Sequence, residues 1–188
     1  MIRQAKPTDT TEILDIYSPY IRDTSITFET EIPSVADLGK RIQSCLENWP
    51  WLVFERNGRI AGYAYASRYR ERAAYQWSIE CSVYIHNDHH RSGIAKALYI
   101  SLFSILKAQG FTKVYAVINL PNDPSVALHE NMGFKYLATY ENVGYKLGKW
   151  KNVGWWQLQL NDYSDEPPTP IKFSALDNET IRRLLNPK

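Results

Sequence analysis

The sequence predicts an α/β fold in which a mixed β-sheet packs against helices. Three observations support this prediction. Up to about Leu160, stretches with the two-residue repeat of strands alternate with stretches that have the 3.6-residue repeat of helices. Two strand-like stretches flank Asn57-Gly58, a strong signal for a two-residue hairpin loop. Gly110 and Gly133 follow helical stretches, where a glycine commonly ends a helix. The predicted order is β-α-α-β-β-β-α-β-α-β-β.

The first third of the chain is expected to form a short strand, two helices and the hairpin. Pro7-Thr8-Asp9 offers turn and N-cap chemistry for the first helix, which Pro19 should end or kink. Ser34 opens the second helix, with Asp37 placed for a capping box, and this helix should stop near Asn48. The expected strands are residues 2–5, 51–55 and 60–67.

The middle of the chain is expected to complete the sheet. Alternation in a strand over 77–86 puts Ile79 and Glu80 on opposite faces. The period then becomes helical over 93–109, and a short helix is capped by Asn122 or its neighbour. The other expected elements are strands at 113–119, 134–140 and 154–160 and a helix at 123–132.

The chain changes character after Asp162. Residues 165–170 have the composition of a linker, and residues 174–185 could form one terminal helix. We therefore expect residues 1–162 to form one domain, followed by a Pro-rich linker and short C-terminal extension at 163–188.

Composition argues against several kinds of function. The net charge is +2 and there is no basic run, so neither nucleic acid nor a membrane is an expected partner. Cys45 and Cys81 lack the spacing of a disulfide framework or zinc site, and His86, His89 and His90 lack that of a metal site. The N-terminus has no apolar signal core and no stretch is long enough to span a bilayer, so a cytoplasmic location is expected.

The most informative stretch is His90-Arg91-Ser92-Gly93-Ile94-Ala95-Lys96, between a predicted strand and a long predicted helix. A glycine here lets the backbone approach a ligand closely. The first turn of the helix presents unpaired N–H groups and the positive end of the helix dipole, which suit a pyrophosphate. Alone the stretch is weak evidence, because strand–turn–helix junctions with one glycine are common.

The surrounding sequence makes this stretch more informative. Gly93 and Ala95 match the last two positions of the motif Q/R-x-x-G-x-G/A, whose first position falls on His90. Further segments follow in order: Ser82–Ile85, Asn122 with Ser125, Leu128–Phe134, Val143–Lys146, Gly148–Trp150 and Gly154–Gln157. This pattern resembles the GNAT superfamily of acetyltransferases, closest to its phosphinothricin and methionine-sulfoximine N-acetyltransferase branch. The resemblance covers roughly residues 2–160.

The resemblance implies a mostly antiparallel central sheet with helices on both faces, acetyl-CoA as cosubstrate, and a homodimer. In the family, pantetheine pairs with the backbone of the central strand, and the pyrophosphate meets amides at the start of the following helix. Carried over by position, the cofactor-binding residues are Val83, Tyr84, Ile85, Arg91, Ser92, Gly93, Ile94, Ala95, Lys96, Asn122 and Asn131.

The resemblance also implies two catalytic residues. Glu80 aligns with the family's catalytic glutamate, a general base for an amine that must lose a proton before it attacks the thioester. The alternative is a strand carboxylate that is solvated or paired with Arg68 or Arg70. His129 stands where many members have a tyrosine that protonates the departing thiolate. Its alternative roles are packing or a hydrogen bond to the coenzyme.

The expected acceptor is a small amino-acid-like amine, such as phosphinothricin or methionine sulfoximine. Arg70 could clamp an anionic group, or it could be a solvated surface residue. The expected substrate-binding residues are Phe28, Tyr69, Arg70, Glu80 and Tyr84. Two other functions remain open: acetylation of a peptide or protein N-terminus, and a non-catalytic acetyl-CoA-binding module. Glu80 argues against the second, which would need no base.

Overall fold

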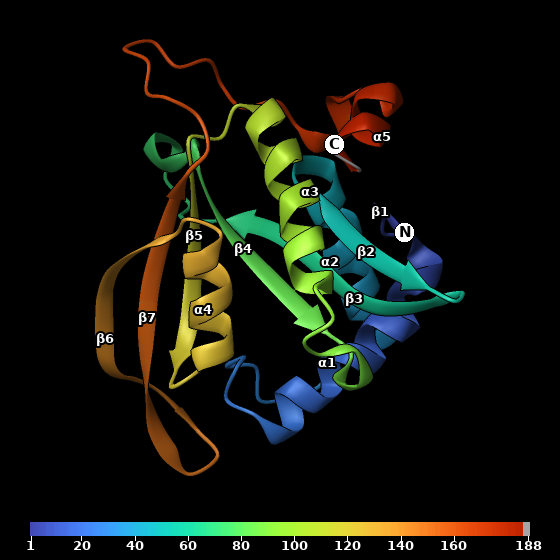
Figure 1. Ribbon diagram of the computed structural model, residues 1–188, viewed down its shortest axis with the longest axis vertical. Helices are drawn as coiled ribbons and strands as arrows, with labels where there is room; N and C mark the ends of the chain where they lie inside the picture. The colour runs from blue at the N-terminus through green and yellow to red at the C-terminus, as the bar shows by residue number, and fades with distance from the viewer. Residues whose placement is uncertain (186–188) are drawn as a thin grey trace.

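The computed structural model describes residues 1–185 and shows one seven-stranded sheet with helices on both faces (Figure 1). The strands are β1 (Ile2–Gln4), β2 (Trp51–Arg56), β3 (Arg59–Arg68), β4 (Ser78–Ile85), β5 (Lys113–Leu120), β6 (Lys135–Lys146) and β7 (Lys149–Gln159). The helices are α1 (Thr10–Asp23), α2 (Val35–Asn48), α3 (Ile94–Gln109), α4 (Asp123–Asn131) and α5 (Asn178–Leu185).

The strand order is β1-β2-β3-β4-β5-β7-β6. Neighbouring strands run antiparallel except β4 and β5, which are parallel. The mixed, mostly antiparallel sheet predicted from the sequence is therefore confirmed.

Each face of the sheet carries its own hydrophobic core. Helices α1 and α2 bury residues such as Ile13 and Ile42 against β2 and β3. Helix α3 crosses the opposite face and packs on β2, β3 and β4, with Leu98 and Leu102 buried in the core there (Figure 1). Alternation along β4 links the two cores, because Ile79 belongs to the α3 side and Tyr84 to the α1 side.

Local sequence signals set several element boundaries as predicted. The Ser34 hydroxyl accepts from the backbone N–H of Asp37 and caps α2, which ends at Asn48. Asn57 and Gly58 have φ of 52° and 74°, as expected for a type I′ hairpin turn. Helix α3 ends before Gly110, whose φ is 94°.

Pro19 does not end α1, which continues to Asp23. A proline inside a helix removes one backbone hydrogen bond and disfavours the preceding turn. Ile16, Tyr17 and Ile21 lie on both sides of it and are buried against the sheet. Their burial stabilises the helix across the proline, because most helical stability in proteins comes from packing of the apolar face.

Strands β6 and β7 are much longer than predicted and meet in a hairpin. The sequence predicted strands only at 134–140 and 154–160, since the glycines and charges between them are typical of a loop. In the structure the strands continue to Leu147-Gly148, where φ is 52° and 74°. A register shift between Tyr140 and Gly144 accommodates extra residues on β6 as a bulge. Because the bulge breaks the alternation of the strand, the sequence pattern did not predict this part of β6.

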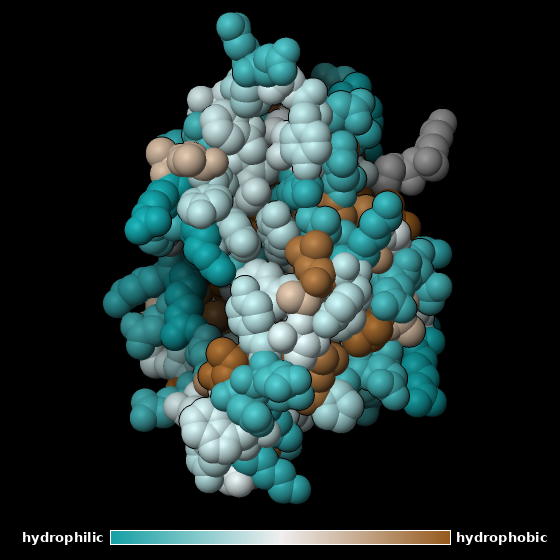
Figure 2. Space-filling view, turned by 90° about the vertical axis from the view of Figure 1, so that its left-hand side faces the viewer, coloured by the Kyte–Doolittle hydropathy of each residue, from teal (hydrophilic) through white to brown (hydrophobic). Residues whose placement is uncertain are grey.

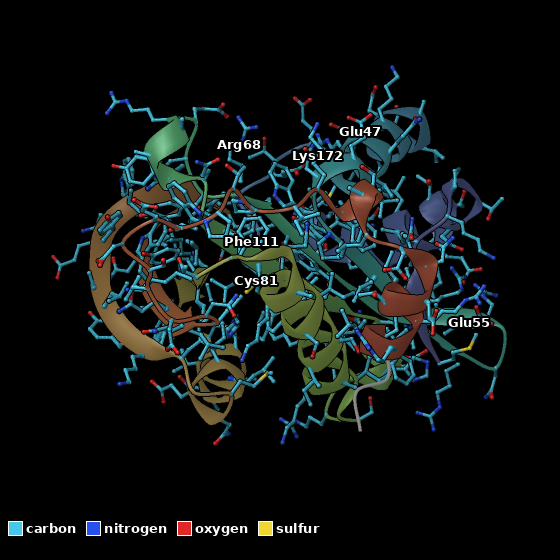
Figure 3. All side chains as sticks on the ribbon, turned by 90° about the horizontal axis from the view of Figure 1, so that it is seen from above. Glu47, Glu55, Arg68, Cys81, Phe111 and Lys172 are labelled. Carbon is cyan, nitrogen blue, oxygen red and sulfur yellow. The ribbon has the colours of Figure 1, made fainter. Side chains whose placement is uncertain are left out.

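The chain after β7 packs back onto the fold. The indole N–H of Trp77 donates to the carbonyl oxygen of Pro168, and Phe173 is buried in the α3-side core. Seen from above, the segment at Lys172 runs between Glu47 of α2 and Arg68 of β3 (Figure 3). The Ser101 hydroxyl of α3 donates to the carbonyl oxygen of Leu185.

The terminal helix begins later than predicted. It spans 178–185, because the Asp177 carboxylate accepts from the N–H of Thr180 and caps it there, and a 3-10 turn occupies 173–175. The end of the expected extension, 186–188, lies outside the described residues.

Three general features of residues 1–185 bear on function. No described helix is long and apolar enough to cross a membrane. No three described His, Cys, Asp or Glu side chains are grouped so that they could hold a metal ion. Cys45 and Cys81 are free thiols, one in each hydrophobic core, and burial raises the pKa of each to about 12.

Candidate active site

Strands β4 and β5 pair over a short distance and then separate. Their register contains three residue pairs and ends at Glu80 and Tyr115. Beyond that point, residues 81–84 of β4 and 116–119 of β5 line opposite walls of a hollow of about 60 Å³. The edge of β4 that faces β5 therefore offers backbone groups to a ligand, as expected for a pantetheine arm, because buried backbone groups require partners.

The hollow continues into a wider one of about 440 Å³ at the N-terminus of α3. Gly93 caps this helix with φ of 80°, and a Cβ added there would meet no atom within 4 Å among the described residues other than its chain neighbours. The first turn of α3 thus faces open space, and a pyrophosphate fits its unpaired N–H groups. The predicted cofactor-binding residues that line this hollow are Val83, Ile85, Arg91, Ser92, Gly93, Ile94, Ala95, Lys96 and Asn122.

Two predicted cofactor-binding residues lie elsewhere. Tyr84 lines the smaller hollow, with most of its ring in the α1-side core. Asn131 is exposed at the C-terminal end of α4, whereas Asn122, Pro124 and Ser125 at the other end line the wide hollow.

His90, at the first position of the coenzyme motif, is tied to the protein itself. Its Nε2 lies 2.9 Å from the Tyr20 hydroxyl and 3.2 Å from the carbonyl oxygen of Ile85. The same tyrosine hydroxyl donates to that carbonyl oxygen at 2.6 Å. His90 therefore fastens the loop before α3 to α1 and the end of β4, while Arg91 and Lys96 are exposed cations beside the hollow.

Glu80 lies at the apex where β4 and β5 separate. Its side chain is 26% exposed, and burial raises the pKa of its carboxyl above the usual value of 4.5, while the Arg70 charge lowers it. Arg70 Nη1 lies 3.7 Å from Glu80 Oε1, a loose ion pair. A carboxylate with a raised pKa is a better match for a general base near neutral pH.

An aromatic cluster holds Arg70 beside Glu80. The Arg70 guanidinium lies over the rings of Tyr69 and Trp155, 4.5 and 5.5 Å from their centroids. The ring of Tyr69 in turn stacks on Tyr115, with centroids 4.5 Å apart. The structure thus brings Tyr69, Arg70 and Glu80 together.

The other two predicted substrate-binding residues contact different elements. Phe28 lies against β6, where a Cβ added to Gly144 would overlap its ring. Tyr84 packs edge-on against Tyr17 and Tyr20 of α1.

His129 lies in the wall of the small hollow and is 3% exposed. Its Nδ1 lies 2.7 Å from the carbonyl oxygen of Ser125, so Nδ1 carries the proton of the neutral ring. Nε2 then accepts from the Tyr99 hydroxyl at 3.2 Å. Burial lowers the pKa of the imidazole, and the Ser125 carbonyl only partly opposes this, so the ring is neutral near pH 7 with both nitrogens engaged.

The sequence interpretation predicted no contact for two buried polar residues, Lys146 and Asn119. Lys146 on β6 is 6% exposed, its Nζ donates to the carbonyl oxygen of Thr27, and burial lowers its pKa. The sequence placed Lys146 in the matched segment Val143–Lys146, outside the predicted strands. Asn119 on β5 lines the small hollow, and its carbonyl oxygen accepts from the Ser25 hydroxyl. Both residues anchor the segment after α1, and only long-range contacts reveal this.

A strand pair that opens beside a glycine-capped helix, with a half-buried carboxylate at its apex, is the architecture of an acetyl-CoA-dependent N-acetyltransferase. A family model described as an acetyltransferase (GNAT) domain matches residues 2–155, and the chain belongs to this family.

Individual relatives agree with the branch that the sequence resembles. A phosphinothricin N-acetyltransferase from Streptomyces viridochromogenes is 40% identical over 171 residues, 91% of this chain and 92% of the relative. An L-methionine sulfoximine/L-methionine sulfone acetyltransferase from Salmonella typhimurium is 29% identical over 87% of this chain and 96% of the relative.

A solved structure shows the same fold in a ligand-bound state. The phosphinothricin acetyltransferase from Sinorhizobium meliloti in complex with acetyl-CoA superimposes with a TM-score of 0.87. It is 31% identical to this chain and covers 94% of it and 97% of its own length.

Proposed function

We propose that this enzyme transfers the acetyl group of acetyl-CoA to the amino group of a small amino-acid-like acceptor such as phosphinothricin or methionine sulfoximine. The observation that carries the proposal is the opening of β4 from β5 at Glu80, beside the hollow at the N-terminus of α3. One relative is named for phosphinothricin and another for methionine sulfoximine and methionine sulfone, and both names support the choice of a zwitterionic acceptor.

The chain has the groups that acetyl-CoA needs. Backbone groups of Val83, Tyr84 and Ile85 would pair with the pantetheine arm. The amides from Arg91 to Lys96 would receive the pyrophosphate, with Asn122 further along the coenzyme. The bound coenzyme supplies the activated acetyl thioester, and backbone N–H groups near Val83 would stabilise the charge that develops on the carbonyl oxygen.

Glu80 would act as the general base. An amino-acid amine is largely an ammonium ion near neutral pH, so it must lose a proton before it can attack. The raised pKa of the Glu80 carboxyl suits it to accept this proton. Tyr69 and Arg70 would hold the acceptor next to it, with the guanidinium facing an anionic group.

His129 would position Tyr99 rather than supply a proton itself. Its ring is neutral and its Nδ1–H is already donated to Ser125. The coenzyme thiol, with a pKa near ~8.5 if it behaves like cysteine, is a tolerable leaving group without an acid.

A homodimer formed through the β6–β7 hairpin is part of the proposal. Large side chains are exposed along it, with Trp150 at 62% and Tyr145 at 59%. Figure 2 looks onto this side of the molecule, where pale and brown surface interrupts the teal. Contiguous apolar surface of this kind is typical of an interface. Sedimentation equilibrium would test it, and a monomer at micromolar concentration would contradict it.

Two further proposals concern location and domains. Acetyl-CoA is a cytoplasmic metabolite, so we propose that the enzyme acts in the cytoplasm.

Residues 1–162 would form the catalytic domain and 163–188 an extension fastened to it through Trp77 and Phe173.

A thiol-release assay with acetyl-CoA tests the activity. Phosphinothricin, methionine sulfoximine, methionine sulfone, ordinary amino acids and short peptides serve as acceptors. We expect release with the first three and little with peptides. Preferred release with peptides would favour a peptide N-terminal acetyltransferase, and coenzyme binding without release from any acceptor would favour a non-catalytic module.

A further inference from the structure

Asn119 has a buried amide that the protein only half satisfies. Its side chain is 7% exposed, and its Oδ1 accepts from the Ser25 hydroxyl at 3.0 Å. Its Nδ2 is buried and has no hydrogen-bond partner anywhere in residues 1–185. Native proteins nearly always pair buried polar atoms, so each exception needs an explanation.

The position of the Asn119 amide explains why it has no partner. Four buried side-chain atoms of residues 1–185 lack partners, and among them Asn119 Nδ2 alone belongs to a residue lining the hollow between β4 and β5. An unpaired donor at the edge of a binding cleft gains a partner when a ligand brings an acceptor to it. Pairing removes the unfavourable free energy of a buried, unpaired donor, and this gain favours binding.

Asn119 faces the same side of the sheet as Glu80. Glu80 and Tyr115 are register partners, and residues two apart on a strand share a face, so Tyr115, Val117 and Asn119 form one row with Glu80. Asn119 lies four residues beyond Tyr115, about 13 Å along the strand. The acceptor site proposed above therefore has a guanidinium at one end, on Arg70, and a neutral amide donor at the other.

The two ends suit different groups of one acceptor. A guanidinium is the natural partner of a carboxylate. A neutral N–H donor buried away from water suits an oxygen without a full charge, because burying an uncompensated charge is far less favourable. An amino acid with a carboxylate and an oxo group on its side chain has one group for each of these two partners.

Resting on the proposed acetyltransferase activity, we propose that Asn119 determines acceptor specificity by donating a hydrogen bond from Nδ2 to an oxo group on the acceptor's side chain. Amino acids whose side chains end in an uncharged S=O or C=O group are then preferred over apolar side chains of the same length. Asn119 acts in binding and takes no part in proton transfer.

Methionine sulfone and methionine form the matched substrate pair, because they differ only in the two sulfone oxygens. We expect wild-type enzyme to acetylate the sulfone with the higher kcat/KM. Asn119→Leu removes the donor at nearly constant size and should lower kcat/KM for the sulfone about fivefold, mainly through KM, with methionine little changed. Asn119→Asp replaces the donor with an acceptor and should lower the sulfone value further.

Two measurements separate this role from a structural one. Because Asn119 also lines the hollow proposed for the pantetheine arm, calorimetric affinity of Asn119→Leu for acetyl-CoA separates a role in acceptor specificity, which requires wild-type affinity, from a role in coenzyme binding, which would lower the affinity and overturn the specificity role. The thermal midpoint of the ligand-free variant should not fall by more than that of Ser25→Ala, because the lost donor had no partner and only the Ser25 bond is broken.

Equal losses for sulfone and methionine, or an unchanged preference, would overturn the specificity role while leaving the acetyltransferase proposal intact. No thiol release by wild-type enzyme with any acceptor of the panel would overturn both.

Discussion

The two halves of the cleft that we propose, one for the coenzyme and one for the acceptor, are built in different ways. The coenzyme half consists of backbone groups on contiguous segments, the end of β4 and the first turn of α3. The acceptor half consists of side chains from distant parts of the chain: Glu80 from β4, Arg70 from the loop before it, and Asn119 from β5. A site made of backbone groups depends on few side chains. A site made of side chains changes its contacts with the ligand whenever one of them is substituted.

This difference between backbone groups and side chains indicates which half can change its ligand by substitution. Coenzyme binding through backbone amides survives most substitutions, since every residue except proline carries an N–H. In our proposal, acceptor choice depends on a few polar side chains, and one of them, Asn119, is held by a single contact with Ser25. Substitutions in the acceptor half should therefore alter turnover and specificity while leaving coenzyme affinity alone.

Glu80→Gln should give the largest effect. Loss of a general base lowers kcat by about a hundredfold, with calorimetric affinity for acetyl-CoA retained. The wild-type rate should rise with pH through the raised pKa of the Glu80 carboxyl, and this limb should vanish in the variant. An unchanged kcat would remove Glu80 from the mechanism.

Stability provides the control for this variant. A carboxyl whose pKa is raised in the folded state favours folding below its usual pKa, and this contribution is lost as pH rises through the folded-state pKa. Near pH 7 the charged Glu80 therefore disfavours folding, so Glu80→Gln should unfold at no lower temperature than wild type. A marked fall would mean that the rate loss reflects misfolding.

The sequence predicted features that depend on neighbouring residues better than features that depend on distant ones. Element order, the α2 cap at Ser34, the Asn57-Gly58 turn and the start of α3 at Gly93 depend on neighbours in the sequence, and the structure contains all four. The long β6–β7 hairpin was missed because its register shifts break alternation. Asn119 and Lys146 were missed because their partners, Ser25 and Thr27, lie 94 and 119 residues away.

Gly93→Val should give the next largest effect, on the coenzyme half. The side chain would occupy the open space in front of α3 and hold the phosphates away from the amides. Losing about one charge-assisted hydrogen bond weakens acetyl-CoA binding about tenfold. Gly58→Val is the matched control, because Gly58 also has positive φ, 74°, and no described neighbour within 4 Å, but lies on the β2–β3 turn. It should be strained equally and bind acetyl-CoA normally, and equal affinities for both variants would show that the phosphate site lies elsewhere.

Arg70→Ala should give the smallest effect and separate the two roles of its charge. As a partner of the acceptor carboxylate, a half-exposed guanidinium contributes at most about 1 kcal/mol, so KM should rise no more than about fivefold. As a neighbour of Glu80 it lowers the pKa of that carboxyl, so its removal should move the acidic limb of the pH–rate profile to higher pH. Arg68→Ala, which breaks a surface pair with Glu71, should change neither. A raised KM without a moved limb would make Arg70 a substrate clamp only, and a moved limb without a raised KM would place the acceptor carboxylate elsewhere in the acceptor half.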